Sequence, residues 1–264
     1  MTEKSRPIRT RAPHDDAPHQ DADTIDFGYE TIAASEKEGR VRQVFDSVAS
    51  SYDVMNDVMS LGIHRLWKDT LINMINPKPD HHLIDLAGGT GDIAGRFLKR
   101  GGGSATIIDI NVEMMLAGKQ RPDLQKLTNL DWVAGNAEHI PVADASADVM
   151  TIAFGLRNVT NRLDALKDAL RVLKPGGRFY CLEFSHVRSA PLARIYDLWS
   201  SALPGFGQVI ARDSASYQYL VESIRKFPNQ ETLSAMFAEA GFARVKCRDL
   251  TMGIAAIHCG WKLD

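Results

Sequence analysis

Residues 82–94 read HLIDLAGGTGDIA, and this stretch decides the fold. The apolar run at 83–86 indicates a buried strand, and the glycine cluster GGTG follows at 88–91. Glycine lets the backbone turn sharply and approach a ligand that a side chain would block. A helix that begins at Asp92 directs its free N–H groups toward that ligand. The segment therefore predicts a strand, a loop that cradles a nucleotide-type cofactor, and a helix.

Composition narrows the class of protein. The 264 residues are 44% apolar and 24% charged, which suits one main domain with a large core. A net charge of −2 gives no global field for nucleic acid, so we expect no nucleic-acid partner. The cysteines Cys181, Cys247 and Cys259 are widely spaced, which favours reduced thiols in the cytoplasm over disulfides or a zinc site. No stretch reaches the roughly 18 apolar residues of a membrane span, and the N-terminus lacks an apolar signal core.

Two segments precede the strand at 83–86. The N-terminal residues are rich in proline and charge and poor in apolar side chains, so we expect a disordered tail over residues 1–34. Residues 35–264 then form the single domain. Apolar side chains at helical spacing, such as Val41, Val44 and Phe45, predict a helical cap over residues 35–78.

After the glycine loop, strands and helices alternate. Short apolar runs predict strands over residues 105–110, 130–134, 147–154 and 178–184. The clearest helix covers residues 162–173 and is stopped by Lys-Pro-Gly-Gly at 174–177. This alternation predicts a parallel sheet with helices on both faces and a ligand beyond the carboxyl ends of the strands. A helix over 229–240 and two strands over 243–250 and 253–261 predict an antiparallel hairpin that finishes the sheet.

Polar residues at the ends of these strands indicate which kind of cofactor the loop binds. Asp109 ends the second strand about 20 residues after the loop, where a carboxylate accepts hydrogen bonds from ribose hydroxyls. Gly-Asn-Ala-Glu at 135–138 is suited to reading an adenine edge. NAD and S-adenosylmethionine share these needs. Each of these features alone also has a simpler structural interpretation: Asp109 could be a helix N-cap, Asn136 a loop residue, and 174–177 a plain turn.

Taken in order, these pieces resemble the class I S-adenosylmethionine-dependent methyltransferases. Four further segments narrow the resemblance to the ubiquinone/menaquinone biosynthesis C-methyltransferase family: YDVMND at 52–57, GIHRLWK at 62–68, FGLRNV at 154–159 and SYQYLVESI at 216–224. The resemblance extends from Phe27 to Lys262. It implies an α/β, Rossmann-like fold with a mainly parallel seven-stranded sheet, a C-terminal antiparallel hairpin and an N-terminal helical cap.

The resemblance also implies an activity and a cofactor site. The activity is C-methylation of 2-methoxy-6-polyprenyl-1,4-benzoquinol, of demethylmenaquinol, or of both, with S-adenosylmethionine as donor and no metal. Ala153 occupies a position where the family has serine, so any contact there is through the backbone. The expected cofactor-binding residues are Asp85, Gly89, Thr90, Gly91, Asp109, Asn136, Ala137 and Ala153.

The chemistry assigns roles to a few side chains. A quinol ring becomes a carbon nucleophile when a hydroxyl loses its proton, from a phenolic pKa of about 10. Arg157 is expected to stabilise the phenolate, and Asn158 to orient a hydroxyl or a water. Tyr52 is the third expected catalytic residue and, with Asp53, a candidate to close the cleft. The candidates for the proton acceptor are Glu183, His186 and Asp213.

The polyprenyl tail needs an apolar path. Residues 186–226 are expected to form a substrate lid, in which 198–211 is the least polar part. We expect a cytoplasmic protein that contacts the inner face of the membrane transiently. A homodimer and contact with other quinone-biosynthesis enzymes stay open. The alternatives are another class I small-molecule methyltransferase and a non-catalytic cofactor-binding subunit, whereas an RNA methyltransferase would need a basic face or an aromatic stacking platform.

Overall fold

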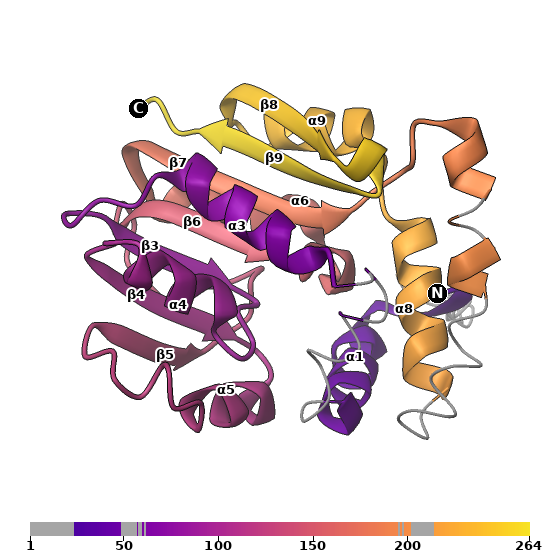
Figure 1. Cartoon of the computed structure of the whole chain (residues 1–264), viewed down its shortest axis with the longest axis horizontal. Coiled ribbons are helices and arrows are strands. Elements are labelled where there is room, and N and C mark those ends of the chain that lie inside the picture. Colours follow the sequence, from indigo (N-terminus) through magenta and orange to yellow (C-terminus); the bar gives the residue numbers. More distant parts are fainter. Residues whose placement is uncertain are drawn as a thin grey trace, which may run out of the picture.

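Seven strands form one sheet in the computed structural model, which describes residues 24–48, 57, 60, 62–194, 196, 198–201 and 214–264 (Figure 1). The order across the sheet is β5-β4-β3-β6-β7-β9-β8, and only the β7–β9 and β8–β9 pairs are antiparallel. This confirms the predicted mainly parallel sheet with an antiparallel end. The bounds are β3 His82–Leu86, β4 Ser104–Asp109, β5 Leu130–Ala134, β6 Ala147–Ala153, β7 Leu173–Phe184, β8 Ala243–Leu250 and β9 Ala255–Trp261.

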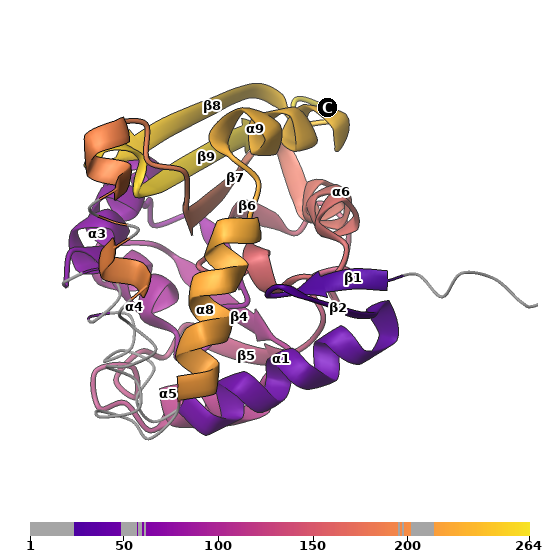
Figure 2. The same cartoon turned by 90° about the vertical axis from the view of Figure 1, so that its right-hand side faces the viewer.

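Helices cover both faces of the sheet. In Figures 1 and 2, α3 and α4 lie on one face and α6 and α9 on the other, while α1 and α8 lie beyond the carboxyl ends of the parallel strands. The bounds are α1 Ala34–Val48, α3 His64–Ile75, α4 Asp92–Lys99, α5 Val112–Lys119, α6 Arg162–Val172, α8 Ser214–Lys226 and α9 Gln230–Glu239, with short 3₁₀ turns η1 Leu156–Asn158 and η2 Thr251–Gly253. None of the helices in the described ranges is long and apolar enough to cross a bilayer.

Alternation along the strands divides the core into two layers. On β3, Leu83 packs with the cluster that includes Phe97 of α4, whereas Ile84 packs with the cluster that includes Leu166 of α6 and Phe237 of α9. Successive side chains of a strand point to opposite faces, so a strand buried on both faces is apolar over most of its length. This requirement explains why the predicted strands were short continuous apolar runs.

The N-terminal boundary differs from the prediction. Residues expected in the disordered tail form an antiparallel pair, β1 Thr24–Phe27 and β2 Glu30–Ala33. The Phe27 ring stacks on Tyr219 of α8 with centroids 4.3 Å apart, and the Tyr29 N–H donates to Glu222 at 2.9 Å. A two-stranded hairpin is marginal alone, and its contacts with a helix about 190 residues later in the chain stabilise it. The prediction of a tail is therefore wrong from Thr24 onward, while residues 1–23 lie outside the described ranges.

The predicted turn at 174–177 lies inside β7 rather than before it. Ala147 pairs with Leu173 and Val149 pairs with Arg178, so four residues of β7 stand opposite one residue of β6. The bulged segment is held from the other side, because the Gly176 N–H donates to the Lys262 carbonyl at 2.8 Å. Helix α6 still ends where expected, since Leu173 is its C-cap in an extended conformation.

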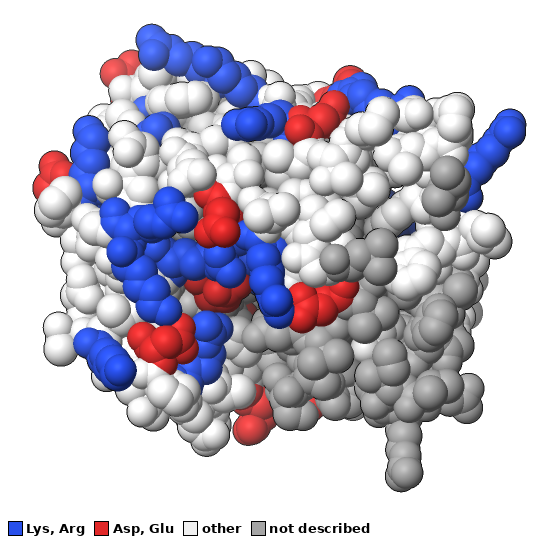
Figure 3. Space-filling model, viewed as in Figure 1, with Lys and Arg blue, Asp and Glu red and all other residues white. Residues whose placement is uncertain are grey.

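Basic side chains gather on the face over α3 and α4 (Figure 3). They alternate with acids there: Arg65 pairs with Asp57 at 2.6 Å and Lys99 with Asp123 at 2.6 Å. Exposed pairs of this kind contribute about 0–1 kcal/mol each. This face is therefore a network of paired charges rather than a continuous cationic surface.

The glycine loop gives a stability prediction. Gly91 has a φ of +78°, and a Cβ there would lie 2.7 Å from Ile107 and 2.9 Å from Trp132, whereas Gly101 has a φ of +89° with no atom within 4 Å. Gly101→Ala should lower the free energy of unfolding by about 1–2 kcal/mol through backbone strain alone. Gly91→Ala should cost at least about 1 kcal/mol more, because its methyl group also overpacks the core. Urea denaturation measures both, and equal costs would contradict the packing argument.

Candidate active site

A pocket opens at the carboxyl ends of the parallel strands, where the topology predicts a ligand site. Its walls come from the loop between β3 and α4, from the ends of β4, β5 and β6, and from α1. The polar and charged side chains in its lining are Glu38, Arg42, Lys68, Asp85, Thr90, Asp92, Asp109, Asn111, Asn136, Glu138, Asn158 and Thr160.

Asp109 connects the strand β4 to the glycine loop. Its Oδ2 accepts a hydrogen bond from the Gly89 N–H at 2.7 Å, and its Oδ1 accepts one from the Asn111 N–H at 2.7 Å. Burial raises the pKa of Asp109, and these backbone donors oppose the shift. Each carboxylate oxygen has a second lone pair, so both still have the capacity to accept from a ligand hydroxyl. The side chain is suited to the ribose contact predicted for it.

Asp85 lies beneath the same loop. Its Oδ1 accepts a hydrogen bond from the Thr151 hydroxyl at 2.7 Å, and the carboxyl is fully buried. Burial raises the pKa of Asp85 to about 7, while the Thr151 hydrogen bond acts in the opposite direction. A Cβ on Gly88 would lie 2.8 Å from Asp85 Oδ2, so the loop can cross above this carboxyl only as glycine.

The β5 end of the pocket carries the predicted adenine-reading turn. Asn136 and Ala137 both line the pocket, and Asn136 Oδ1 accepts from the Glu138 N–H at 2.8 Å. Helix α1 lies against the ends of both β5 and β4. After β5, Asn136 Nδ2 donates to Glu38 at 3.4 Å, and after β4, Asn111 Nδ2 donates to Asp46 at 2.8 Å. The sequence placed helices before the first strand but gave no signal that Glu38 or Asp46 would meet these asparagines.

Seven of the eight residues predicted for the cofactor line the pocket; the exception is Gly91. Gly91 instead caps α4, and its missing side chain makes room for core residues of β4 and β5. Ala153 lines the pocket at the end of β6 without a hydroxyl to donate, as the departure from the serine of the family predicts.

Arg157 does not lie where the sequence analysis expected it. Its side chain is completely buried, is absent from the lining of the pocket, and pairs with Glu183 at 2.7 Å. The same guanidinium donates to the Phe154 carbonyl at 2.6 Å. Phe154 has a φ of +57°, an unfavourable conformation for a bulky residue, and it lines the pocket. Arg157 therefore supports a strained turn of the pocket wall, and Glu183 is its partner rather than a free proton acceptor.

Asn158 does line the pocket, next to the buried Arg157. Its Oδ1 accepts a hydrogen bond from the Tyr219 hydroxyl of α8 at 3.1 Å. Burial raises the pKa of Tyr219 to about 12, so this hydroxyl is a donor at neutral pH. In the sequence, Tyr219 stands out only as part of a segment typical of the family. Its position two residues after Tyr217 gave no sign that it would meet Asn158.

The remaining predicted residues are Tyr52, Asp53, His186 and Asp213, together with the apolar part of the expected lid. Tyr52, Asp53, Asp213 and most of the apolar part of the expected lid lie outside the described residues. His186 Nε2 lies 2.9 Å from the Phe227 carbonyl, so this nitrogen is the protonated one and donates. His186 lines a second pocket with Tyr196, Val221 and Arg225, apart from the first.

Asp85 gives a pH prediction. The pKa of about 7 in the folded chain lies above the ordinary value near 4, so between these values the folded chain binds a proton that the unfolded chain releases. The contribution of Asp85 to the free energy of unfolding should therefore fall as the pH rises from about 4 to about 7, by up to about 1.4 kcal/mol per pH unit. Urea denaturation of the wild type and of Asp85→Asn across this window measures the difference. Parallel pH curves for the two proteins would refute the assignment.

The Arg157–Glu183 pair gives a second prediction. Arg157→Met should lower the free energy of unfolding by about 3–5 kcal/mol, because Glu183 then keeps an unpaired buried charge. Replacing both residues by methionine should cost less than the single change, since no lone charge remains. Urea denaturation of the single and double variants forms a double-mutant cycle. Additive costs would mean that the two side chains do not stabilise each other.

Comparison with known proteins agrees with this site. Residues 33–262 match the ubiE/COQ5 methyltransferase family. The chain is 53% identical over 243 residues to the ubiquinone/menaquinone biosynthesis C-methyltransferase UbiE of Ruegeria sp. (strain TM1040), covering 91% of this chain and 97% of that protein. It is 50% identical over 274 residues to the mitochondrial 2-methoxy-6-polyprenyl-1,4-benzoquinol methylase of Mus musculus, covering 90% of this chain and 84% of that protein.

Solved structures show the same fold at low sequence identity. A SAM-dependent methyltransferase from Thermotoga maritima superposes with a TM-score of 0.61 at 19% identity, covering 83% of this chain and 98% of that one. A SAM-dependent methyltransferase from Aquifex aeolicus gives a TM-score of 0.54 at 14% identity, covering 74% and 89%. The fold is that of the class I methyltransferases, and the family implies S-adenosylmethionine as methyl donor. The chain belongs to the ubiE/COQ5 methyltransferase family, as its sequence segments predicted.

Proposed function

We propose that this protein transfers the methyl group of S-adenosylmethionine to a ring carbon of 2-methoxy-6-polyprenyl-1,4-benzoquinol, of demethylmenaquinol, or of both. The names of the relatives from Ruegeria and mouse support this class of acceptor. The observation that carries the proposal is the oriented Asn158 amide in the wall of the cofactor pocket. Bound S-adenosylmethionine supplies the electrophilic methyl group.

The residues of the pocket fit that cofactor. The loop at Gly88 lines the pocket, and it can pass this close to Asp85 only because residue 88 has no side chain. Asp109 supplies carboxylate oxygens for hydroxyls, and Asn136 supplies an amide at the β5 end. Thr90 and the backbone at Ala153 complete the contacts that we propose.

Asn158 is the group that we assign to the acceptor. The Tyr219 hydroxyl donates to Asn158 Oδ1, so the amide nitrogen Nδ2 is the end left for the pocket. An N–H donor aimed at a quinol oxygen stabilises the phenolate that makes the ring carbon nucleophilic. Helix α1 covers the pocket with Val41 and Phe45, whose apolar side chains exclude water and strengthen such interactions.

Arg157 acts in this proposal as a positioning residue. Its hydrogen bond to the Phe154 carbonyl holds the turn that precedes Asn158, and its pairing with Glu183 balances its charge. We assign Tyr52 to closing the cleft, as the sequence segment at 52–57 predicts. The apolar lid within 186–226 and a transient contact with the membrane surface remain part of the proposal for the prenyl tail.

The test is an assay with purified protein, a short-chain prenylated quinol and S-adenosylmethionine labelled in its methyl group. Label on a ring carbon is the expected product. Label on oxygen, or no transfer to either quinol, would contradict the proposed function and favour another small-molecule acceptor or a non-catalytic role.

Asn158→Leu should lower kcat by roughly 100- to 1000-fold, the usual effect of losing one oxyanion donor. S-adenosylhomocysteine should bind this variant within about twofold of the wild type, because the amide serves the acceptor rather than the cofactor. Asn161→Ala is the matched control: Asn161 caps α6 through the Asp164 N–H and lies outside the lining, so kcat should be kept. Equal losses in both variants would mean that Asn158 acts through the fold.

A further inference from the structure

Lys68 is a buried cation in the wall of the cofactor pocket. It lies on α3, is 4% exposed, and its Nζ donates to Asp92 Oδ2 at 2.8 Å. Among the described residues that line the pocket, only Lys68 and Arg42 carry a guanidinium or ammonium group. Arg42 is about half exposed on α1 and pairs with Glu38 at 3.1 Å. Lys68 is thus the one buried cation of the described lining.

Apart from Lys68 and Arg42, the described charged side chains that line the pocket are acidic. Glu38, Asp85, Asp92, Asp109 and Glu138 all contribute to the pocket. Such a site attracts the cationic parts of S-adenosylmethionine, its sulfonium and its ammonium group, but repels its α-carboxylate. A carboxylate buried without a cationic partner is costly, and Lys68 is the group in this wall that can offset that cost.

The position of Lys68 matches the amino-acid end of the cofactor. Asp109 and Asn136 mark the ribose and adenine end, at the tips of β4 and β5. Lys68 approaches from α3 and meets Asp92, the first residue of α4 after the glycine loop. The pocket therefore extends from the ends of β4 and β5, along the loop, to the ammonium group of Lys68.

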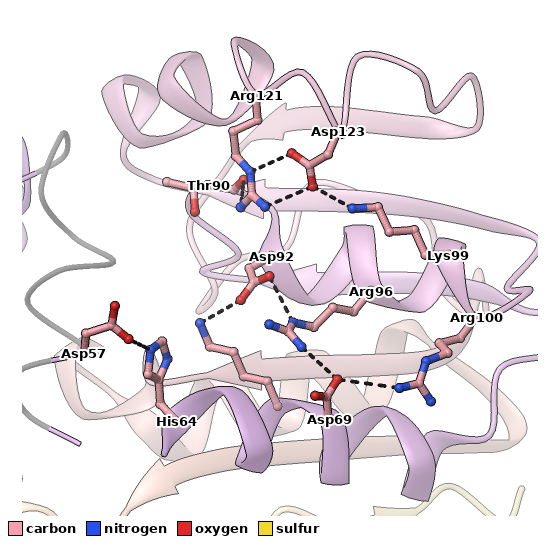
Figure 4. A network of polar contacts seen from close by, with 11 residues as sticks. Asp57, His64, Asp69, Thr90, Asp92, Arg96, Lys99, Arg100, Arg121 and Asp123 are labelled. Carbon is pink, nitrogen blue, oxygen red and sulfur yellow. Dashed lines mark hydrogen bonds and ion pairs between the residues drawn. The ribbon is translucent and has the colours of Figure 1, made fainter. Parts of the chain in front are cut away.

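Asp92 fixes the position of this ammonium group. Burial opposes ionisation of Asp92, but Lys68 and then Arg96 outweigh it and lower the pKa of Asp92 to about 2. Figure 4 shows the network continuing from Asp92 to Arg96, whose guanidinium donates to Asp69 at 2.8 Å. The ammonium of lysine has three N–H donors, and within the described residues Asp92 is the one hydrogen-bond acceptor of Lys68. Two donors therefore remain for a ligand.

We propose that Lys68 binds the α-carboxylate of S-adenosylmethionine. In the sequence, the segment 62–68 is only a marker of the family, and the proposed contact gives its final lysine a function. The proposal rests on S-adenosylmethionine as donor and is independent of which acceptor is methylated. Binding of the cofactor alone therefore tests it, whatever the outcome of the quinol assay.

The experiment is isothermal titration of the full chain with two ligands: S-adenosylhomocysteine, and the same molecule without its carboxylate, 5′-(3-aminopropylthio)-5′-deoxyadenosine. Lys68→Met should raise the Kd of S-adenosylhomocysteine by roughly 10- to 100-fold, the effect expected for a lost charged hydrogen bond. The Kd of the decarboxylated ligand should stay within about twofold of its wild-type value.

Arg96→Met is the matched control. Arg96 pairs with the same Asp92, at 3.0 Å, but is absent from the lining of the pocket, so the ratio of the two Kd values should remain that of the wild type. If Lys68→Met does not fold, Lys68→Met with Asp92→Asn removes both charges and should show the same loss of carboxylate discrimination. An equal loss for both ligands, no loss for either, or an equal change of the ratio in Arg96→Met would overturn the proposal.

Discussion

The hydrogen bond from the Gly89 N–H to Asp109 is the interaction on which the pocket depends. It joins the loop after β3 to the end of β4, two neighbouring parallel strands whose carboxyl ends meet at one edge of the sheet. Because Asp109 also accepts from the Asn111 N–H, one buried carboxylate sets the start of α5 and the path of the glycine loop together. The position of α4 follows from that path, and with it the position of Asp92 and the contact with α3.

Features encoded locally could be read from the sequence. The strands β5 and β8 have the predicted bounds, and α9 has them to within one residue, because apolar periodicity and caps act over a few residues. Asn229, for example, caps α9 by accepting from the Thr232 N–H. The glycine loop, Asp109 and Asn136 were likewise found in place, since strand ends in this fold meet at a fixed edge.

Features that depend on distant partners could not be read. The hairpin at 24–33 is too small to bury its apolar side chains by itself, and α8 supplies its packing. Arg157 was expected at the reacting atoms because it follows a strand, but Glu183, at the end of the neighbouring strand, pairs with it inside the core. A charged side chain near a strand end can face the pocket or the core, and the sequence pattern does not distinguish the two. Lys68 had no role for a different reason: it lies on α3, and its partner Asp92 is on another helix, 24 residues later in the chain.

The charges of the site divide into those that are compensated within the protein and those that are not. Asp92 has Lys68 and Arg96, and Arg157 has Glu183, so each of these charges has a partner of opposite sign within the protein. Asp85 has hydrogen bonds from the Thr151 hydroxyl and the Ala94 backbone but no cationic partner among the described residues. Burial, with the acids Asp109 and Asp92 nearby, raises its pKa. A cation bound beside Asp85 would favour its ionised form, whereas an anion would oppose it. The carboxyl that lowers the stability of the folded chain near neutral pH is therefore one whose charged form a bound cation would stabilise.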